Sequence, residues 1–173
     1  KEPSLHGAYY SHNAVDRGSK LRFVYPVTRA DADCFIEVLT TFLAFIVSLP
    51  KMFVVRILRA DAGSVYTARK VREFLASRGI FLQIAAPQAP HQISAAERNH
   101  GVLLCTMRAI MAFANAPNGF WALALKYAAV LNNHMAADYQ SGSPQIPWLA
   151  VGGAIDLDAL LIFGCLVIIV KTK

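Results

Sequence analysis

The sequence Ile-Leu-Arg-Ala-Asp-Ala-Gly at residues 57–63, followed by Ala-Ala-Glu-Arg at 95–98, decides the fold that we expect for this chain. Residues 53–58 form a β-branched, apolar run typical of a strand, which delivers Asp61 at its carboxyl end before a glycine turn. A helix over 67–77, a strand over 80–85 and a proline-containing loop over 86–92 are expected next. A long helix over 93–114 then carries Glu97 in its first turn, and Glu97, Gly101 and Cys105 share a face that the small Gly101 should allow to approach the sheet closely.

Asp61 and Glu97 are the candidate catalytic and metal-binding residues, and thirty-five residues separate them. An acid at the tip of a strand and another at the start of a helix can meet at one point. Hard divalent cations such as Mg²⁺ and Mn²⁺ prefer carboxylate oxygens of this kind. A glutamate in the first turn of a helix usually only complements the helix dipole, so its pairing with Asp61 is what indicates a metal site.

The stretch resembles the catalytic core of integrases from copia-type LTR retrotransposons. That family has Leu-Arg-Ser-Asp-Asn-Gly-Gly-Glu-Phe and, at the same spacing as here, a Glu within Asn-Gly-Val-Ala-Glu-Arg. The corresponding residues are 58–66 and 93–98. Further matches are Phe-Trp-Ala at 120–122 and Phe-Gly-Cys-Leu at 163–166, so that the resemblance extends over nearly the whole chain.

The resemblance implies an α/β, ribonuclease-H-like fold, with a mixed sheet of about five strands flanked by helices. The expected elements include a hairpin of strands 9–15 and 21–27 and helices over 30–48 and 118–133. Residues 1–137 form the core-like domain, and residues 138–173 form a linker and a C-terminal strand extension. The family's first catalytic Asp lies on the strand before this hairpin, so we expect that strand to be missing. Asp16 is a turn residue and not its substitute.

The chemistry implied by the resemblance is DNA integration by phosphoryl transfer (strand transfer) with two Mg²⁺ or Mn²⁺ ions. Three carboxylates are needed, and this chain supplies Asp61 and Glu97. Supporting positions also differ, with Ala62 where the family has Asn, Val65 where it has an acid and Gln88 where it has Tyr. Lost polar supports loosen ligand geometry. We therefore expect a fragment of a retrotransposon polyprotein that resembles a polynucleotidyl transferase and whose activity is impaired.

The charge of the chain favours a polyanionic partner. Seventeen Lys and Arg against eleven Asp and Glu give a net charge of +6 and an isoelectric point near 9.4. The expected partner is DNA, both the element ends and the target, and the candidate contacts are Arg59, Arg69, Lys70 and Arg98. For Arg69 and Lys70, a solvated basic face is the favoured interpretation over a dedicated DNA contact. The expected location is intracellular, in the nucleus or in a cytoplasmic virus-like particle.

Two further features leave alternatives open. The second half of the expected helix over 30–48 is apolar nearly all round, which is typical of an oligomer interface or an exposed sticky patch. Apolar runs over 39–49 and 160–170 are too short to cross a bilayer, so no membrane partner is expected. One alternative is thus a non-catalytic, nucleic-acid-binding or self-associating module on the same scaffold. Another is an unrelated α/β domain in which the two acids are coincidental. The five histidines have no zinc-binding spacing.

Overall fold

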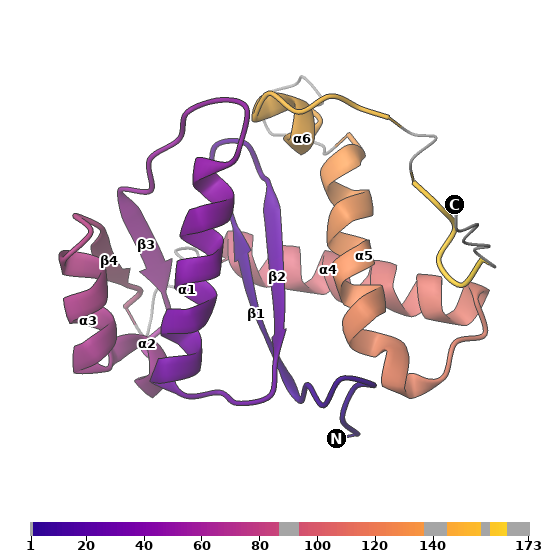
Figure 1. Ribbon diagram of the computed structural model, residues 1–173, viewed down its shortest axis with the longest axis horizontal. Coiled ribbons are helices and arrows are strands. Elements are labelled where there is room, and N and C mark those ends of the chain that lie inside the picture. Colours follow the sequence, from indigo (N-terminus) through magenta and orange to yellow (C-terminus); the bar gives the residue numbers. More distant parts are fainter. Residues whose placement is uncertain (1, 87–93, 137–144, 157–159, 166–173) are drawn as a thin grey trace, which may run out of the picture.

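The computed structural model describes residues 2–86, 94–136, 145–156 and 160–165 (Figure 1). In chain order the elements are β1 (Tyr10–Val15), β2 (Arg22–Val27), α1 (Ala32–Val47), β3 (Ile57–Ala60), α2 (Ser64–Thr67), α3 (Arg69–Ala76), β4 (Phe81–Ile84), α4 (Ser94–Phe113), the 3₁₀ turn η2 (Asn118–Phe120), α5 (Trp121–His134) and α6 (Pro147–Ala150). In the view of Figure 1, α1 lies in front of the strands and α4 lies behind them.

The expected N-terminal hairpin is confirmed. β1 and β2 pair antiparallel, with Tyr10 opposite Val27. Asp16 closes the turn because its Oδ2 accepts hydrogen bonds from the backbone N–H of Ser19 at 2.6 Å and from the Ser19 hydroxyl at 2.8 Å. Asp16 is therefore an exposed turn residue, as its sequence context predicts.

The second strand pair is parallel and shorter than predicted. β3 pairs with β4, with Ile57 opposite Phe81, and α2 and α3 connect the two strands. The expected strand over 53–58 is shifted, because residues 53–56 form no strand and the side chain of Val54 is 75% exposed. The expected helix over 67–77 is divided at Ala68, whose backbone is extended.

The described residues contain four strands, arranged as two separate two-stranded sheets, β1–β2 and β3–β4. The predicted α/β class therefore holds, whereas a single sheet of about five strands is not confirmed. Within the described part of the chain, β1 and β3 each pair on one side only, so no strand ladder joins the two sheets.

Helix α1 begins at a well-made N-cap. The Asp31 carboxylate accepts a hydrogen bond from the backbone N–H of Cys34 at 2.8 Å, which satisfies one of the free donors of the first turn. One turn further on, Phe35 and Leu39 are buried against Leu75 of α3. The N-terminal half of α1 thus covers the β3–β4 unit.

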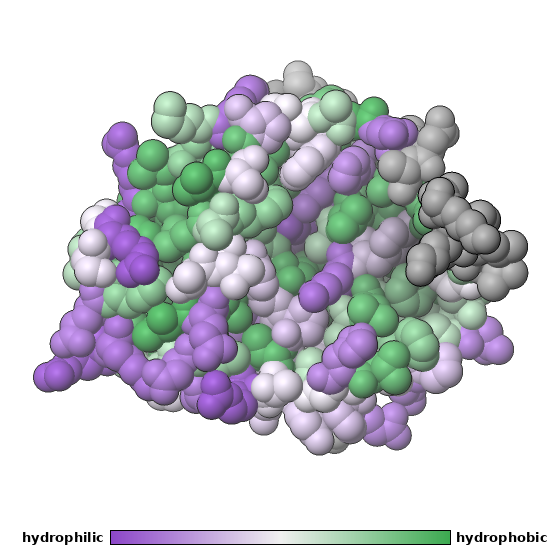
Figure 2. Space-filling view, in the orientation of Figure 1, coloured by the Kyte–Doolittle hydropathy of each residue, from purple (hydrophilic) through white to green (hydrophobic). Residues whose placement is uncertain are grey.

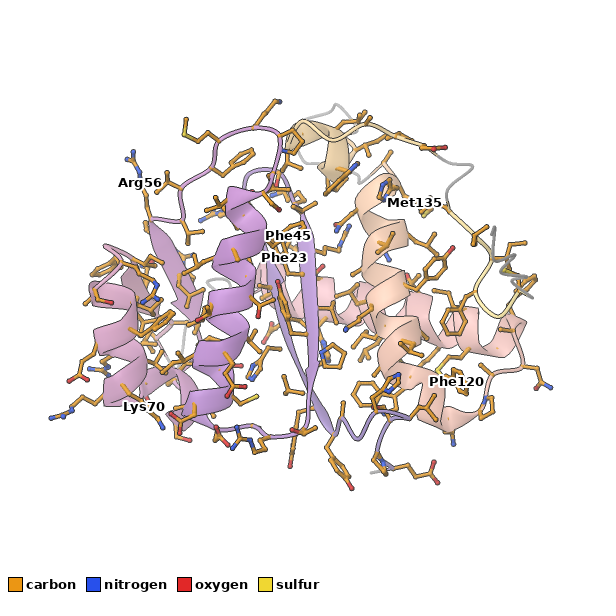
Figure 3. All side chains as sticks on the ribbon, viewed as in Figure 1. Phe23, Phe45, Arg56, Lys70, Phe120 and Met135 are labelled. Atoms are coloured by element: carbon orange, nitrogen blue, oxygen red, sulfur yellow. The ribbon has the colours of Figure 1, made fainter. Side chains whose placement is uncertain are left out.

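The C-terminal half of α1 covers the other sheet. Ile46 is buried with Phe23 of β2, and the rings of Phe42 and Phe45 stand edge-on to Phe23 at centroid distances of 4.7 and 5.4 Å (Figure 3). Val47, at the end of the helix, is 82% exposed. The apolar half of this helix is therefore covered on one side, and part of the other side faces solvent.

Helices α4 and α5 pack against each other and against the hairpin. Leu103 of α4 is fully buried with Val24 of β2 and with Leu125 of α5. The Asn133 side chain fastens α5 to β2, since its Oδ1 accepts from the backbone N–H of Arg22 at 2.8 Å and its Nδ2 donates to the Arg22 carbonyl at 2.9 Å. This packing holds the long helix that carries Glu97.

The predicted C-terminal strand is not seen in the described residues. Residues 160–165 form no strand, and the remainder of the expected strand, like most of the expected linker, lies outside the described residues. Among the helices that are described, none has the length and apolar character needed to span a membrane.

The core that α1 and α3 share supplies a first test. Replacing Leu75, which is 1% exposed, by Ala is expected to lower the free energy of unfolding by about 2–5 kcal/mol, because a buried methyl cluster is lost and a cavity remains. Leu149→Ala, at a position 46% exposed, is the matched control and should cost much less. Urea unfolding of both variants measures the difference, and equal losses would contradict this description of the core.

Candidate functional site

Asp61 lies directly after the last residue of β3, as predicted, and a tight turn orients it. Its Oδ1 accepts a hydrogen bond from the backbone N–H of Gly63 at 2.9 Å. A Cβ at position 63 would lie 2.9 Å from Oδ1 of Asp61 and 3.3 Å from the Tyr66 ring, so a larger residue there would displace the Asp61 carboxylate from this turn. The exposed carboxylate is thus held at the carboxyl end of the strand by a close backbone approach.

Next to Asp61 is a cluster of three rings from three different elements. His12 of β1, Phe35 of α1 and Tyr66 of α2 lie with centroid distances of 5.0 Å for His12–Phe35, 4.9 Å for Phe35–Tyr66 and 6.1 Å for His12–Tyr66. The Tyr66 hydroxyl is 3.4 Å from Nδ1 of His12. The cluster ties the turn that bears Asp61 to the hairpin and to α1.

The rings of His12 and Tyr66 are only partly exposed to solvent. Burial raises the pKa of the Tyr66 phenol, and the negative charge of Asp61 raises it further. Burial also lowers the pKa of His12, whose Nε2 has no hydrogen-bond partner among the described residues. Sequence reasoning missed both residues. The alternation of β1 would have placed His12 on the face that α1 covers, but without the fold its partners could not be identified.

Glu97 lies in the first turn of α4, as predicted, and is exposed. Our prediction of which face of α4 packs on the sheet is wrong, however. Gly101 is exposed, and a Cβ there would meet nothing within 4 Å, so it does not permit a close approach to the sheet. Asn99 and Leu103 are the buried residues instead. The helix is therefore rotated relative to the expectation, which had assumed that Glu97 faces inward.

The joint use of Asp61 and Glu97 stays a prediction. Both side chains are exposed and lie at the ends of their elements where the sequence predicts them. Within the described ranges, no group of three or more His, Cys, Asp or Glu side chains is arranged to hold a metal ion. The loop expected over 86–92, which leads to α4, lies largely outside the described residues.

Three of the four residues predicted to contact DNA form ion pairs or hydrogen bonds with other residues of the chain. Lys70 forms an ion pair with Asp33 of α1 at 2.5 Å, and Arg69 forms one with Glu73 in the same helix at 3.2 Å. The guanidinium of Arg59 donates to the Gln83 side chain of β4, at 2.8 Å from Nη2. Lys70 projects outward from the start of α3 (Figure 3). Arg98 is exposed on α4 beside Glu97.

Comparison with curated proteins finds transposon polyproteins of Saccharomyces cerevisiae. The truncated transposon Ty1-A Gag-Pol polyprotein is 30% identical over 160 residues, which cover 92% of this chain and 13% of that protein. The transposon Ty1-DR4 Gag-Pol polyprotein is 29% identical over 160 residues, with 92% and 10% covered. The chain therefore spans about a tenth of the length of these relatives. No protein-family model matches it.

Comparison with solved structures finds retroviral integrases. The catalytic core domain of BIV integrase superposes with a TM-score of 0.62 at 17% identity, over 82% of this chain and 90% of that one. The HTLV-2 integrase catalytic core domain in complex with magnesium, in a trimeric form, gives 0.60 at 20% identity, over 82% and 83%. The predicted resemblance to a copia-type integrase catalytic core is confirmed.

A third neighbour comes from a larger assembly. The simian T-cell lymphotropic virus intasome, solved in complex with PP2A regulatory subunit B56 gamma, contains a chain that superposes with a TM-score of 0.69 at 18% identity, over 90% of this chain and 52% of that one. These likenesses establish the ribonuclease-H-like α/β fold of the integrase-core-like chain. They do not by themselves assign roles to its side chains.

The ring cluster generates a pH prediction. Because burial lowers the pKa of His12 in the folded chain, the unfolded chain binds that proton more readily, and stability should fall as the pH drops from 7 through about 6.5 towards 5. His12→Phe keeps a ring against Phe35 and removes the titration, so its stability should depend less on pH in this window. Urea midpoints measured across the range test this, with His6→Phe, at an exposed position, as the control.

A steeper pH dependence in His12→Phe than in the wild-type chain would contradict the assignment. So would an equal flattening in His6→Phe, since that side chain lies outside the cluster.

Proposed function

We propose that this chain is an integrase-core fragment of a retrotransposon polyprotein in which the DNA-joining activity is impaired. The observation that carries the proposal is the position of Asp61 at the carboxyl end of β3 within an integrase-core fold. Glu97 in the first turn of α4 supports it, since this is the second position that the resemblance implies. The proposed reaction is strand transfer, a phosphoryl transfer on DNA.

The proposal includes a divalent cation. Asp61 and Glu97 are of the right type to bind it, but two carboxylates are too few. Asp61 and Glu97 carry hard oxygen ligands suited to Mg²⁺ or Mn²⁺. One oxygen of Asp61 already accepts the Gly63 N–H, and the described residues include no third acid grouped with these two. When bound, such an ion activates a hydroxyl nucleophile and stabilises the leaving oxygen. Two carboxylates do not complete that site, so we derive no catalytic step from it.

The residues around Asp61 support impairment. Val65 occupies the place of the family's acidic residue, and its side chain packs against the core that contains Phe35 and Leu75. Ala62, where the family has Asn, is exposed and has no side-chain polar group. Both substitutions keep the fold and remove polar groups that would orient a neighbouring ligand. In this chain the integrase-core fold is therefore better preserved than the polar groups that the reaction requires.

A strand-transfer assay with Mn²⁺ tests this proposal. We expect the wild-type chain to give less than about one hundredth of the rate of a complete integrase core, since small misplacements of ligands cost about a hundredfold. Asp61→Asn removes the charge of a proposed metal ligand and should reduce any residual signal further. Full activity that Asp61→Asn or Glu97→Gln abolishes would overturn the proposed impairment and establish the two carboxylates as catalytic.

The second candidate is a non-catalytic module that binds nucleic acid or associates with itself. Exposed apolar side chains favour it, and Figure 2 shows green residues gathered over the upper part of α1 and the segment that leads to β3. The exposed large apolar residues of the described chain include Val47, Met52, Val54, Ile57 and Phe81. A patch of this kind is typical of an interaction surface. The solved neighbours include a trimeric integrase core and an intasome, which supports an oligomer as a proposal for this chain.

DNA binding can be tested separately from catalysis. Arg98→Ala is expected to weaken binding to DNA of any sequence and to reduce the slope of log affinity against log salt by about one, because one phosphate contact is lost. Lys126→Ala, an exposed residue on α5, is the charge-matched control. Fluorescence anisotropy over a range of salt concentrations measures both variants. Equal effects of the two substitutions would indicate that binding follows net charge and not a site at Arg98.

A nuclear location, or one in a cytoplasmic virus-like particle, is part of the same proposal. It follows from the proposed activity on DNA and from the polyprotein relatives.

A further inference from the structure

A groove of about 600 Å³ lies where the end of α4, the start of α5 and the N-terminal segment meet. Its volume is within the range of about 300–1,000 Å³ that is typical of small-molecule sites. Neither Asp61 nor Glu97 lines this groove, so it is separate from the candidate catalytic residues.

Backbone hydrogen bonds hold the walls of the groove in place. α4 ends in a left-handed cap at Asn115, whose φ is 46°, and the N–H of Ala116 donates to the Met111 carbonyl at 2.9 Å. The N–H of Leu5 donates to the Gly119 carbonyl at 2.7 Å, and in Figure 1 the N-terminal segment lies beside the turn between α4 and α5. The shape of the groove is therefore set by the fold before a ligand binds.

The apolar part of the groove consists of two methionines and a tryptophan. Met107 and Met111 lie one turn apart on α4, Trp121 begins α5, and all three side chains are partly exposed. Met107 and Trp121 also pack against the buried cluster that contains Leu103, which fixes them from the interior. Thioether sulfurs and an indole ring are favourable neighbours for an aromatic ring, so this part of the groove suits a flat aromatic group.

The groove also carries two opposite charges that do not bind each other. The guanidinium of Arg108 and the carboxylate of Glu2 both line it, and both side chains are exposed. Neither side chain forms an ion pair or a hydrogen bond within the described part of the chain. Both charges are therefore available to a ligand, and a ligand with one carboxylate and one ammonium group can pair with both.

This charge pattern distinguishes between classes of ligand. A polyanion such as DNA would bring its phosphates against the Glu2 carboxylate, and like charges placed together weaken binding. An uncharged apolar ligand would use the methionines and Trp121 but would leave both charges unpaired. An aromatic compound with both charges matches all the groups that line the groove.

We propose that this groove binds a small aromatic zwitterion, of which an aromatic amino acid is the simplest example. Its ring lies against Met107, Met111 and Trp121. Its carboxylate pairs with Arg108 and its ammonium group pairs with Glu2. The inference rests on the groove alone and does not require the proposed activity on DNA.

The probe is L-phenylalanine, and two analogues each lack one charge: 3-phenylpropionate has no ammonium group, and 2-phenylethylamine has no carboxylate. Each compound is titrated into the full chain while the methionine methyl groups are followed by NMR. We expect L-phenylalanine to shift the methyl signals of Met107 and Met111 with a dissociation constant on the order of 1 mM, as its few atoms allow. Met52 and Met135, which are 95% and 61% exposed and lie outside the groove, are the internal controls.

The two charges can be tested separately. L-Phenylalanine should bind about twofold to fivefold more tightly than either analogue, because each exposed ion pair contributes modestly. Arg108→Gln should abolish the preference for phenylalanine over phenylethylamine, and Glu2→Gln should abolish the preference over phenylpropionate. Arg72→Gln, at an exposed position on α3, is the charge-matched control and should keep both preferences. All three positions are exposed, so the variants should fold.

The proposal would be overturned by unshifted Met107 and Met111 signals up to the solubility limit of phenylalanine. Equal affinities for the three compounds, or equal shifts at Met52 and Met135, would also overturn it. Shifts at Met107 and Met111 that appear without ligand and rise with protein concentration would show that a second copy of the chain occupies the groove instead.

Discussion

The packing of α1 across both strand pairs is the contact on which the whole structure depends. A two-stranded sheet is barely stable in water by itself, because it has one weak ladder and little buried area. Phe35 and Leu39 bury one end of α1 against the β3–β4 unit, and Ile46 buries the other end against the hairpin. Since β1 and β3 do not pair with each other, the side chains of this helix hold the two strand pairs together. The buried apolar residues of both halves of the helix follow from that double contact, whereas Val47 at its end faces solvent.

The position of Asp61 is a consequence of this arrangement. β3 has only four residues, so the ladder alone fixes the direction of Asp61 weakly. The turn at Gly63 and the contact between the rings of Tyr66 and Phe35 position it further. His12 of β1 contacts Phe35 and so links this turn to the hairpin. The turn that bears this acid is thus tied to α1 and β1 through the ring of Tyr66, whereas the Asp61 side chain itself bonds only to Gly63. Glu97 has no comparable support in the described residues, because the buried side of α4 is the one with Asn99 and Leu103.

The sequence predicts most elements correctly because their signals are local. Asp31 before an apolar run predicts the start of α1, and the turn at Asp16 predicts the hairpin. The errors arise where tertiary context decides. Residues 53–56 have strong β-propensity but pair with no strand among the described residues, so they stay outside β3. The inner face of α4 was assigned from Glu97, whereas burial of Leu103 against Val24 sets the rotation of the helix. No local pattern distinguishes these two rotations, since Gly101 and Cys105 are as small as an inner face requires.

The substitutions near Asp61 separate the requirements of folding from those of chemistry. Val65 replaces a polar position with a side chain that packs under α1, so selection for stability alone would accept it. Gly63 donates its backbone N–H to the Asp61 carboxylate and has no Cβ to displace that side chain, whether or not a metal binds. Both residues are therefore explained by the fold. Asp61 is different, because its side chain is exposed and makes one hydrogen bond that Asn or Ser can also make in such a turn. An acid at this position is not required by folding, which supports the proposal that a divalent cation binds there.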